Sequence, residues 1–185
     1  MKDEWCTVSA TRLAGWIRER RATSSEVVEA HIERIRRANP VLNAMVQDRF
    51  DKAREEAREA DERVRSAPPE SLPPLLGVPC SIKECFALRG MPNTSGLPSR
   101  AGRPATADAT AVTRLRAAGA IPLGVTNVSE LCMWMETDNR VYGRTNNPYD
   151  PRRIVGGSSG GEGAIVGLGG APFGLGSDIG GSIRI

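Results

Sequence analysis

Two clusters rich in glycine and serine stand near the end of the sequence, at residues 156–163 (GGSSGGEG) and 176–184 (GSDIGGSIR). Glycine lets a backbone approach a ligand closely, so successive N–H groups can point at one atom. Such donors stabilise the oxyanion that forms when a nucleophile attacks an amide carbonyl. In the second cluster, four consecutive N–H groups belong to Ile179, Gly180, Gly181 and Ser182. The hydroxyl of Ser182 completes this turn and is the nucleophile that we predict.

Other uses of glycine-rich sequence fit these clusters less well. A flexible Gly/Ser linker lacks large apolar residues, but Ile165, Leu168, Phe173 and Leu175 lie between the clusters. A P-loop needs a Gly-Lys pair, which is absent from the chain, and the Gly-x-Gly-x-x-Gly spacing of a Rossmann turn is absent from residues 156–182. A cradle for phosphate on another backbone pattern stays open, and would make the chain a non-catalytic anion- or nucleotide-binding module.

A serine hydroxyl needs a base to become nucleophilic, and Lys83 is the candidate. It ends an apolar segment, residues 75–83, that we predict to be a buried strand. Burial favours the neutral form of a lysine, which can accept a proton. The open alternative is a solvated strand end at which Lys83 pairs with Glu84. The only histidine, His31, flanks the apolar stripe of a predicted helix, so we do not expect it to be the base.

These motifs resemble the amidase signature family and, within it, the fatty-acid amide hydrolase branch. The two clusters carry most of the resemblance, which extends to residues 78–84 (VPCSIKE), 125–127 (VTN) and 143–150 (GRTNNPYD). The resemblance therefore covers about residues 75–185 with specific motifs, and the preceding part loosely.

The resemblance implies a Ser-Ser-Lys triad made of Lys83, Ser158 and Ser182. In this triad Lys83 takes a proton from Ser158, and Ser158 takes one from Ser182. The return path protonates the leaving amine. The resemblance also implies a cis peptide bond between Gly157 and Ser158, and it places Ser158 beside the substrate together with residues 179–182. It implies no metal and no organic cofactor.

Further positions carry over from the same family pattern. Ser159 is expected to hydrogen-bond within the proton relay, with capping of a helix that begins at Gly160 as the alternative. Asp178 and Arg184 bracket the nucleophile and are expected to form an ion pair that shapes its turn. Cys132 is expected to line the acyl pocket, or else to be a small buried core residue.

Hydrophobic periodicity predicts the elements that must position these residues. Predicted helices cover residues 9–20, 23–39, 50–66 and 109–118, and another begins at Asn127 or Ser129 and runs through Trp134. Asn39-Pro40 is expected to end the second helix. Predicted strands cover residues 42–47, 75–83 and 121–125. Strands that alternate with helices indicate an α/β fold with a largely parallel sheet. The resemblance implies the amidase-signature fold, in which helices cover a mixed sheet behind an N-terminal helical layer.

The length of 185 residues predicts one domain. Residues 1–66 are its helical N-terminal region and residues 75–185 its catalytic signature region, joined by a proline-rich loop. Members of the family run to several hundred residues. We therefore expect the chain to be the N-terminal part of a single amidase domain that is incomplete at its C-terminus.

Composition argues against several classes of protein. The net charge is only +3, and basic residues alternate with acidic ones, so we expect no nucleic-acid partner. The four cysteines form no CxxC pair, which favours reduced thiols in the cytoplasm. The charged N-terminus does not look like a signal peptide, and no apolar run reaches the ~18 residues of a membrane span. The expected partner is a small-molecule amide substrate, and a homodimer is left open.

Together these observations predict an amide hydrolase that cleaves carboxylic or fatty-acyl amides through an acyl-serine intermediate. The alternative within the family is the glutaminase-type A subunit of a tRNA-dependent amidotransferase, which passes ammonia to a partner. A chain of this family that is inactive because it is truncated is the third alternative.

Overall fold

A computed structural model describes residues 2–185 and contains one four-stranded sheet. Its strands are β1 (Met45–Asp48), β2 (Pro79–Lys83), β3 (Ile121–Thr126) and β4 (Gly174–Leu175), in the order β1-β3-β2-β4. Strand β2 runs parallel to both β3 and β4, whereas β1 pairs with β3 in the antiparallel direction. The α/β class and the mixed, largely parallel sheet are therefore confirmed.

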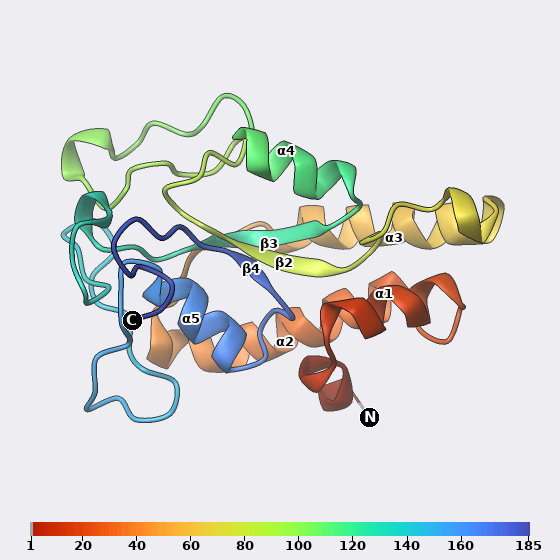
Figure 1. Ribbon diagram of the computed structural model, residues 1–185, viewed down its shortest axis with the longest axis horizontal. Helices are drawn as coiled ribbons and strands as arrows, with labels where there is room; N and C mark the ends of the chain where they lie inside the picture. Colours follow the sequence, from red (N-terminus) through yellow and green to blue (C-terminus); the bar gives the residue numbers. More distant parts are fainter. Residues whose placement is uncertain (1) are drawn as a thin grey trace.

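Helices cover both faces of this sheet (Figure 1). The α-helices are α1 (Ala10–Arg18), α2 (Ser24–Leu42), α3 (Phe50–Ser66), α4 (Thr110–Ala117) and α5 (Gly160–Gly167). Short 3₁₀ turns lie at Lys2–Thr7, Pro69–Ser71, Pro98–Arg100 and Glu130–Cys132. Helix α4 packs on one face, and α2 and α5 lie on the other. No helix among residues 2–185 is long and apolar enough to cross a membrane.

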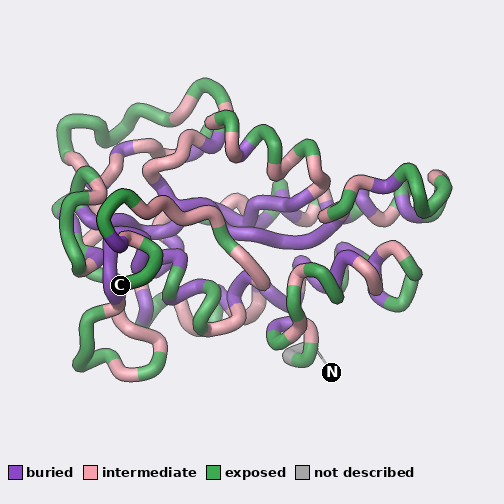
Figure 2. The backbone as a smooth tube through the Cα atoms, viewed as in Figure 1, coloured by how far each residue is buried: buried purple, intermediate pink, exposed green. Residues whose placement is uncertain are grey.

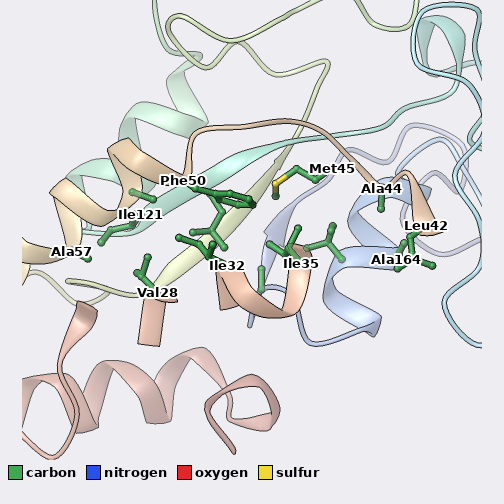
Figure 3. Packing of buried hydrophobic residues seen from close by; sticks show 14 residues of the cluster. Val28, Ile32, Ile35, Leu42, Ala44, Met45, Phe50, Ala57, Ile121 and Ala164 are labelled. Carbon is green, nitrogen blue, oxygen red and sulfur yellow. The ribbon is translucent and has the colours of Figure 1, made fainter. Parts of the chain in front are cut away.

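The largest core cluster joins the helices to the sheet. Figure 3 shows Val28, Ile32 and Ile35 of α2 packed near Phe50 of α3 and Ile121 of β3. In α3 the alanines at positions 53, 57 and 60 are buried, which brings the helix backbone close to its neighbours. A second cluster joins α1 to α2 and to the end of α3, and it forms the predicted N-terminal helical layer.

The central strands β2 and β3 are buried along their whole length (Figure 2). Parallel strands that are covered on both faces have nearly continuous apolar sequences. For this reason the segment 121–125 could be predicted as a strand. Strand β2 is shorter than the predicted 75–83, because Val78 N donates to Leu75 O and closes a turn at Gly77, which has φ of 79°. Lys83 is the last residue of β2.

Helix α2 begins as predicted but ends later. The Thr23–Glu26 capping box is present, and the helix continues through Pro40 to Leu42. Proline removes one backbone donor, a small loss in the last turn of a helix. Asn39 ties the end of the helix to the start of β1, since its Oδ1 accepts from Ala44 N at 2.9 Å and Met45 N at 2.8 Å, and its Nδ2 donates to Met45 O at 2.8 Å. The prediction that Asn39-Pro40 stops the helix is wrong for this reason.

The predicted helix after β3 is also wrong. Only the 3₁₀ turn Glu130–Cys132 forms, because Leu131 and Cys132 have φ of 53° and 60°, in the left-handed region. Ser129 Oγ closes the following loop by donating to Trp134 O at 2.9 Å and Glu136 O at 2.6 Å. Apolar spacing in this segment therefore does not reflect a helix, and the side chains of Leu131 and Trp134 are exposed.

Candidate active site

Lys83 is fully buried, with 0% of its surface exposed, and it is surrounded by serine hydroxyls. Its Nζ donates to Ser158 Oγ at 2.7 Å, to Ser159 Oγ at 2.9 Å and to Ser177 Oγ at 2.9 Å. The solvated strand end considered as an alternative is therefore excluded. Because β2 and β4 are parallel, the segments that follow them emerge at one edge of the sheet, which brings Lys83 to Ser177.

Glu84 points away from this group of hydroxyls, as neighbouring side chains of an extended chain do. Its carboxylate accepts from Thr94 Oγ1 at 2.8 Å, from Ser95 N at 2.7 Å and from Tyr142 OH at 2.7 Å. Glu84 therefore does not pair with Lys83, and instead it holds the loop near residue 94 against Tyr142.

The first glycine–serine cluster precedes and begins helix α5, and almost all of it is buried. The peptide bond between Gly157 and Ser158 is cis, as the resemblance implies. A Cβ on Gly161 would overlap the backbone of Asn127, so glycine is needed there for close packing of α5. Ser159 is the residue before α5 but makes no capping bond with its side chain. Instead its Oγ accepts from Lys83 and donates to Ser177 O at 3.1 Å.

Glu162 anchors α5 to the two central strands. Its carboxyl oxygens accept from Ser81 Oγ of β2 and Thr126 Oγ1 of β3, both at 2.6 Å. Burial raises the pKa of Glu162 to about 7, against the effect of these two hydrogen bonds. The contact fixes the start of α5, and with it Ser158 and Ser159, relative to Lys83. Sequence reasoning assigned no role to Glu162, although a glutamate among glycines was a signal.

The second cluster forms a turn that is held by Asp178. The carboxylate accepts from Gly181 N at 2.7 Å and Ile183 N at 3.1 Å. It also pairs with Arg184, whose Nε is 2.9 Å from Asp178 Oδ2, as the resemblance implies. The Arg184 guanidinium and these N–H donors hold the pKa of Asp178 well below its ordinary value.

The turn brings Ser182 to the first cluster through its main chain. Ser159 N donates to Ser182 O at 3.0 Å. Within residues 2–185, the Ser182 hydroxyl makes no hydrogen bond, so the structure joins Lys83 to Ser158 but does not join Ser158 to Ser182.

The four N–H groups expected to form the oxyanion hole differ in their surroundings. The Gly181 N–H is engaged by Asp178. Those of Ile179, Gly180 and Ser182 meet no acceptor in the described part of the chain. Ile179 is 97% exposed, so this side of the turn is open to solvent. Three unoccupied donors therefore lie in the same turn as the Ser182 hydroxyl.

Two residues lie at this site although sequence reasoning gave them no role. Ser177 contacts Lys83, and Cys85 Sγ is 4.0 Å from Ser177 Oγ. Cys132 was expected to line the acyl pocket or to be a small core residue, and its side chain is half-buried in the turn Glu130–Cys132 rather than part of the core. Ser177 stands inside the second cluster, so its type and place were the available signal; no pattern indicated Cys85.

His31 lies away from the Lys83 group, in the interior of α2. It is fully buried rather than at the flank of the helix, and its Nδ1 lies 2.8 Å from Val27 O of the same helix. Desolvation lowers the pKa of His31, and its Nε2 has no hydrogen-bond partner among residues 2–185. His31 is therefore not placed to act as a base for the serine hydroxyls around Lys83.

Known proteins are similar to this chain in sequence and in fold. The family model described as Amidase matches residues 26–185. Fatty-acid amide hydrolase 2-A of Danio rerio is 56% identical over 183 residues, which cover 96% of this chain and 34% of that protein. The A subunit of the glutamyl-tRNA(Gln) amidotransferase of Acidothermus cellulolyticus is 43% identical over 176 residues, or 95% of this chain and 34% of that protein.

Solved structures agree with the sequence comparison. A structure of fatty acid amide hydrolase superposes with a TM-score of 0.92 at 32% identity, covering 99% of this chain and 32% of that one. The chain thus spans about a third of the length of the relatives that it matches. From the family match and the shared fold, the chain belongs to the amidase family.

Proposed function

We propose that the protein hydrolyses carboxylic amides through an acyl-serine intermediate, with Lys83, Ser158 and Ser182 as its triad. The observation that carries this proposal is the 2.7 Å contact between the buried Lys83 Nζ and Ser158 Oγ. In the described part of the chain, Lys83 is bonded to neutral hydroxyls and to no carboxylate, and in its neutral form a lysine can accept a proton.

The reaction begins with attack of Ser182 Oγ on the amide carbon. Its proton passes to Ser158, and that of Ser158 passes to Lys83, so that no free alkoxide accumulates. For this step the Ser182 hydroxyl must turn toward Ser158. The hydrogen bond from Ser159 N to Ser182 O already holds the two segments side by side. Catalytic hydrogen bonds are often long in a free enzyme and shorten when substrate binds.

The oxyanion is stabilised by donors of the second cluster. The free N–H groups of Ile179, Gly180 and Ser182 supply this stabilisation, and loss of one such donor costs ~10²–10³ in rate. The relay then runs in reverse and delivers a proton to the leaving amine. Water attacks the acyl-serine by the same path, which releases the carboxylic acid and restores Ser182.

A fatty-acyl amide is the substrate class that we propose. The similarity to fatty-acid amide hydrolase 2-A supports it. So does an exposed apolar surface beside Cys132, to which Leu131, Met133 and Trp134 contribute.

We also propose the cytoplasm as the compartment. The four cysteines are free thiols in the described chain, which is usual for proteins of that reducing compartment.

The glutaminase-type A subunit remains the second candidate, and its support is the 43% identity to such a protein. It fits less well, because the similarity to the fatty-acid amide hydrolase is higher, at 56%. Glutamine cleavage that depends on an added partner protein would favour this candidate over the first.

The test is labelling of the full-length protein by a fluorophosphonate, which traps activated serines, followed by fragment mapping. One adduct on Ser182 is expected, and it should be lost in Ser182→Ala and in Lys83→Met. Ser71→Ala is the matched control, because this exposed serine bonds only Pro68 O of its own turn. An unlabelled full-length protein, or an adduct on another serine, would contradict the proposed triad.

A further inference from the structure

Thr137 lies in the loop after β3 and is fully buried, and neither the sequence motifs nor the proposed relay gives it a role. Its hydroxyl donates to Gly156 O at 2.9 Å and accepts from Gly160 N at 2.9 Å. These two residues stand two positions before and two positions after Ser158. One side chain therefore ties the first cluster on both sides of the serine that contacts Lys83.

The loop that contains Thr137 also packs directly on the first cluster. A Cβ added to Gly157 would meet Trp134 O at 2.7 Å and Ser129 Oγ at 2.8 Å, so the backbone of the cluster lies against the loop at this point. Ser129 Oγ holds this part of the loop by donating to two of its carbonyl oxygens. The loop is thus in contact with the residue that precedes Ser158.

The position of Thr137 is set from the same edge of the sheet as that of Lys83. Thr137 O accepts from Thr145 N at 2.9 Å, and Thr145 Oγ1 accepts from Asn127 Nδ2 at 2.9 Å. Asn127 follows the last residue of β3, Thr126, which pairs in register with Lys83 of the parallel strand β2. The lysine and the threonine are therefore placed by neighbouring strand ends.

The other contacts of Ser158 and its neighbour are with members of the proposed triad. The Ser158 hydroxyl accepts from Lys83, and the next residue, Ser159, donates its N–H to Ser182 O. A proton relay needs its groups at hydrogen-bond distance, and a displacement of ~1 Å can cost ~10²-fold in rate. The contacts of Thr137 come from outside the triad, so they stay in place while the Ser182 hydroxyl changes its orientation.

We propose that Thr137 is a positioning residue of the site: through Gly156 and Gly160 its hydroxyl holds Ser158 at hydrogen-bond distance from Lys83. The effect on catalysis rests on the proposed function, whereas the tether itself does not. A valine has nearly the shape of threonine but can make neither bond, and it leaves a buried carbonyl and a buried N–H without partners. A serine can make both bonds, since a hydroxyl donates once and also accepts.

The catalytic test compares Thr137→Val with Thr137→Ser in the full-length protein. In Thr137→Val, hydrolysis of a fatty-acyl amide should lose about 10–10²-fold in kcat with KM within about twofold of the wild type, because substrate still binds but the relay is misaligned. Turnover is counted per Ser182 that a fluorophosphonate labels at completion, so that unfolded protein does not lower kcat. Thr137→Ser should recover most of the turnover. Thr113→Val, at an exposed threonine of α4, is the matched control and should leave kcat unchanged.

Hydrogen exchange at single-amide resolution gives a readout that does not depend on activity. Gly160 is the first residue of α5, so its N–H has no acceptor within the helix, and Thr137 Oγ1 is the acceptor that the structure gives it. In Thr137→Val this amide should exchange faster, and in Thr137→Ser it should stay protected. If Thr137→Val fails to fold, both measurements use Thr137→Ala, which leaves space for a water between the two backbone groups.

The outcomes separate the tether from its effect on catalysis. Unchanged turnover per labelled site in Thr137→Val overturns the positioning role, and a loss that Thr137→Ser does not recover overturns its assignment to the hydroxyl. Unchanged exchange at Gly160 overturns the tether. A wild-type protein that neither hydrolyses amides nor is labelled at Ser182 counts against the proposed function, and exchange at Gly160 still decides the tether.

Discussion

The two glycine–serine clusters are built in different ways. The first, residues 156–163, is buried and bonded to residues far away in the sequence: Ser158 to Lys83, and Glu162 to Ser81 and Thr126. The second, residues 176–184, is only partly buried and is held by Asp178 within its own turn. The proposed base is thus fixed by the packed core, and the proposed nucleophile by local hydrogen bonds. Rigidity on one side and accessibility on the other suit a site that must admit substrate.

Replacing the base should have the largest effect. In Lys83→Met the relay has no final proton acceptor, and kcat should fall by about 10²–10⁴-fold. Lys52→Met is the matched control, since this exposed lysine pairs with Glu55 on the surface of α3. Circular dichroism should show both variants folded. Activity of Lys83→Met within tenfold of the wild type would mean that the buried side of the site does not supply the base.

The pH dependence of stability tests the anchor of the first cluster. Folded Glu162 keeps its proton up to about pH 7, whereas the unfolded chain loses it near the ordinary pKa of 4.5. Its contribution to stability is therefore complete below pH 4.5 and is lost as pH rises to 7, by on the order of 3 kcal/mol.

In Glu162→Gln the side chain cannot titrate, so this variant should not show the loss of stability that the wild type shows as pH rises to 7. Relative to the wild type, its free energy of unfolding in urea should improve from pH 5 to pH 8. Glu70→Gln, at an exposed glutamate in the turn Pro69–Ser71, should show no such change. Parallel pH curves for Glu162→Gln and the wild type would show that the carboxyl is not held neutral by the fold.

Replacing a glycine by alanine should cost more stability at a tightly packed position of the first cluster than in the second cluster. In Gly161→Ala the new Cβ meets the Asn127 backbone, so the free energy of unfolding should drop by about 1–3 kcal/mol. Gly163, in the same helix, and Gly180, in the second cluster, would have no atom within 4 Å of an added Cβ. Gly163→Ala should stabilise by up to about 1 kcal/mol, and Gly180→Ala should change little. Thermal unfolding measures all three, and equal losses would contradict the contrast.

The smallest effect is expected at Asp178, because its bonds are local. In Asp178→Ala the amides of Gly181 and Ile183 lose their acceptor and should exchange hydrogen faster, while the melting temperature stays near that of the wild type. Arg184→Ala, which leaves the Asp178 carboxylate in place, should keep both amides protected. Faster exchange across α5 as well would show that the two clusters are not independent.

Much of the fold could be predicted from the sequence because its signals are periodic and local. Helix α3 has the predicted bounds, since alanines recur on one face between a charged surface and a proline-rich loop. The buried strands that end at Lys83 and Thr126 were visible as apolar runs. The failed helix after Asn127 depended on the left-handed backbone of Leu131 and Cys132, which tertiary contacts impose and residue type does not reveal.

The candidate site was predictable to a similar degree. The family resemblance pointed to Lys83 and Ser158, and the structure places them in contact. The contacts of Ser177 and Glu162 were not predictable, because they depend on which strands lie side by side and on how α5 packs over them. For the same reason, sequence could not show that Glu84, adjacent to the lysine, belongs to a different network.

The Asn39-Pro40 pair has a consequence for the chemical ageing of the protein. The Asn39 side chain makes three hydrogen bonds that join the end of α2 to β1, and deamidation would replace its donor with an oxygen that cannot bond Met45 O. Asparagine deamidates when the next backbone nitrogen loses its hydrogen and attacks the side-chain carbonyl. Pro40 has no such hydrogen. The proline that removes one helical donor therefore also protects the asparagine that joins α2 to β1.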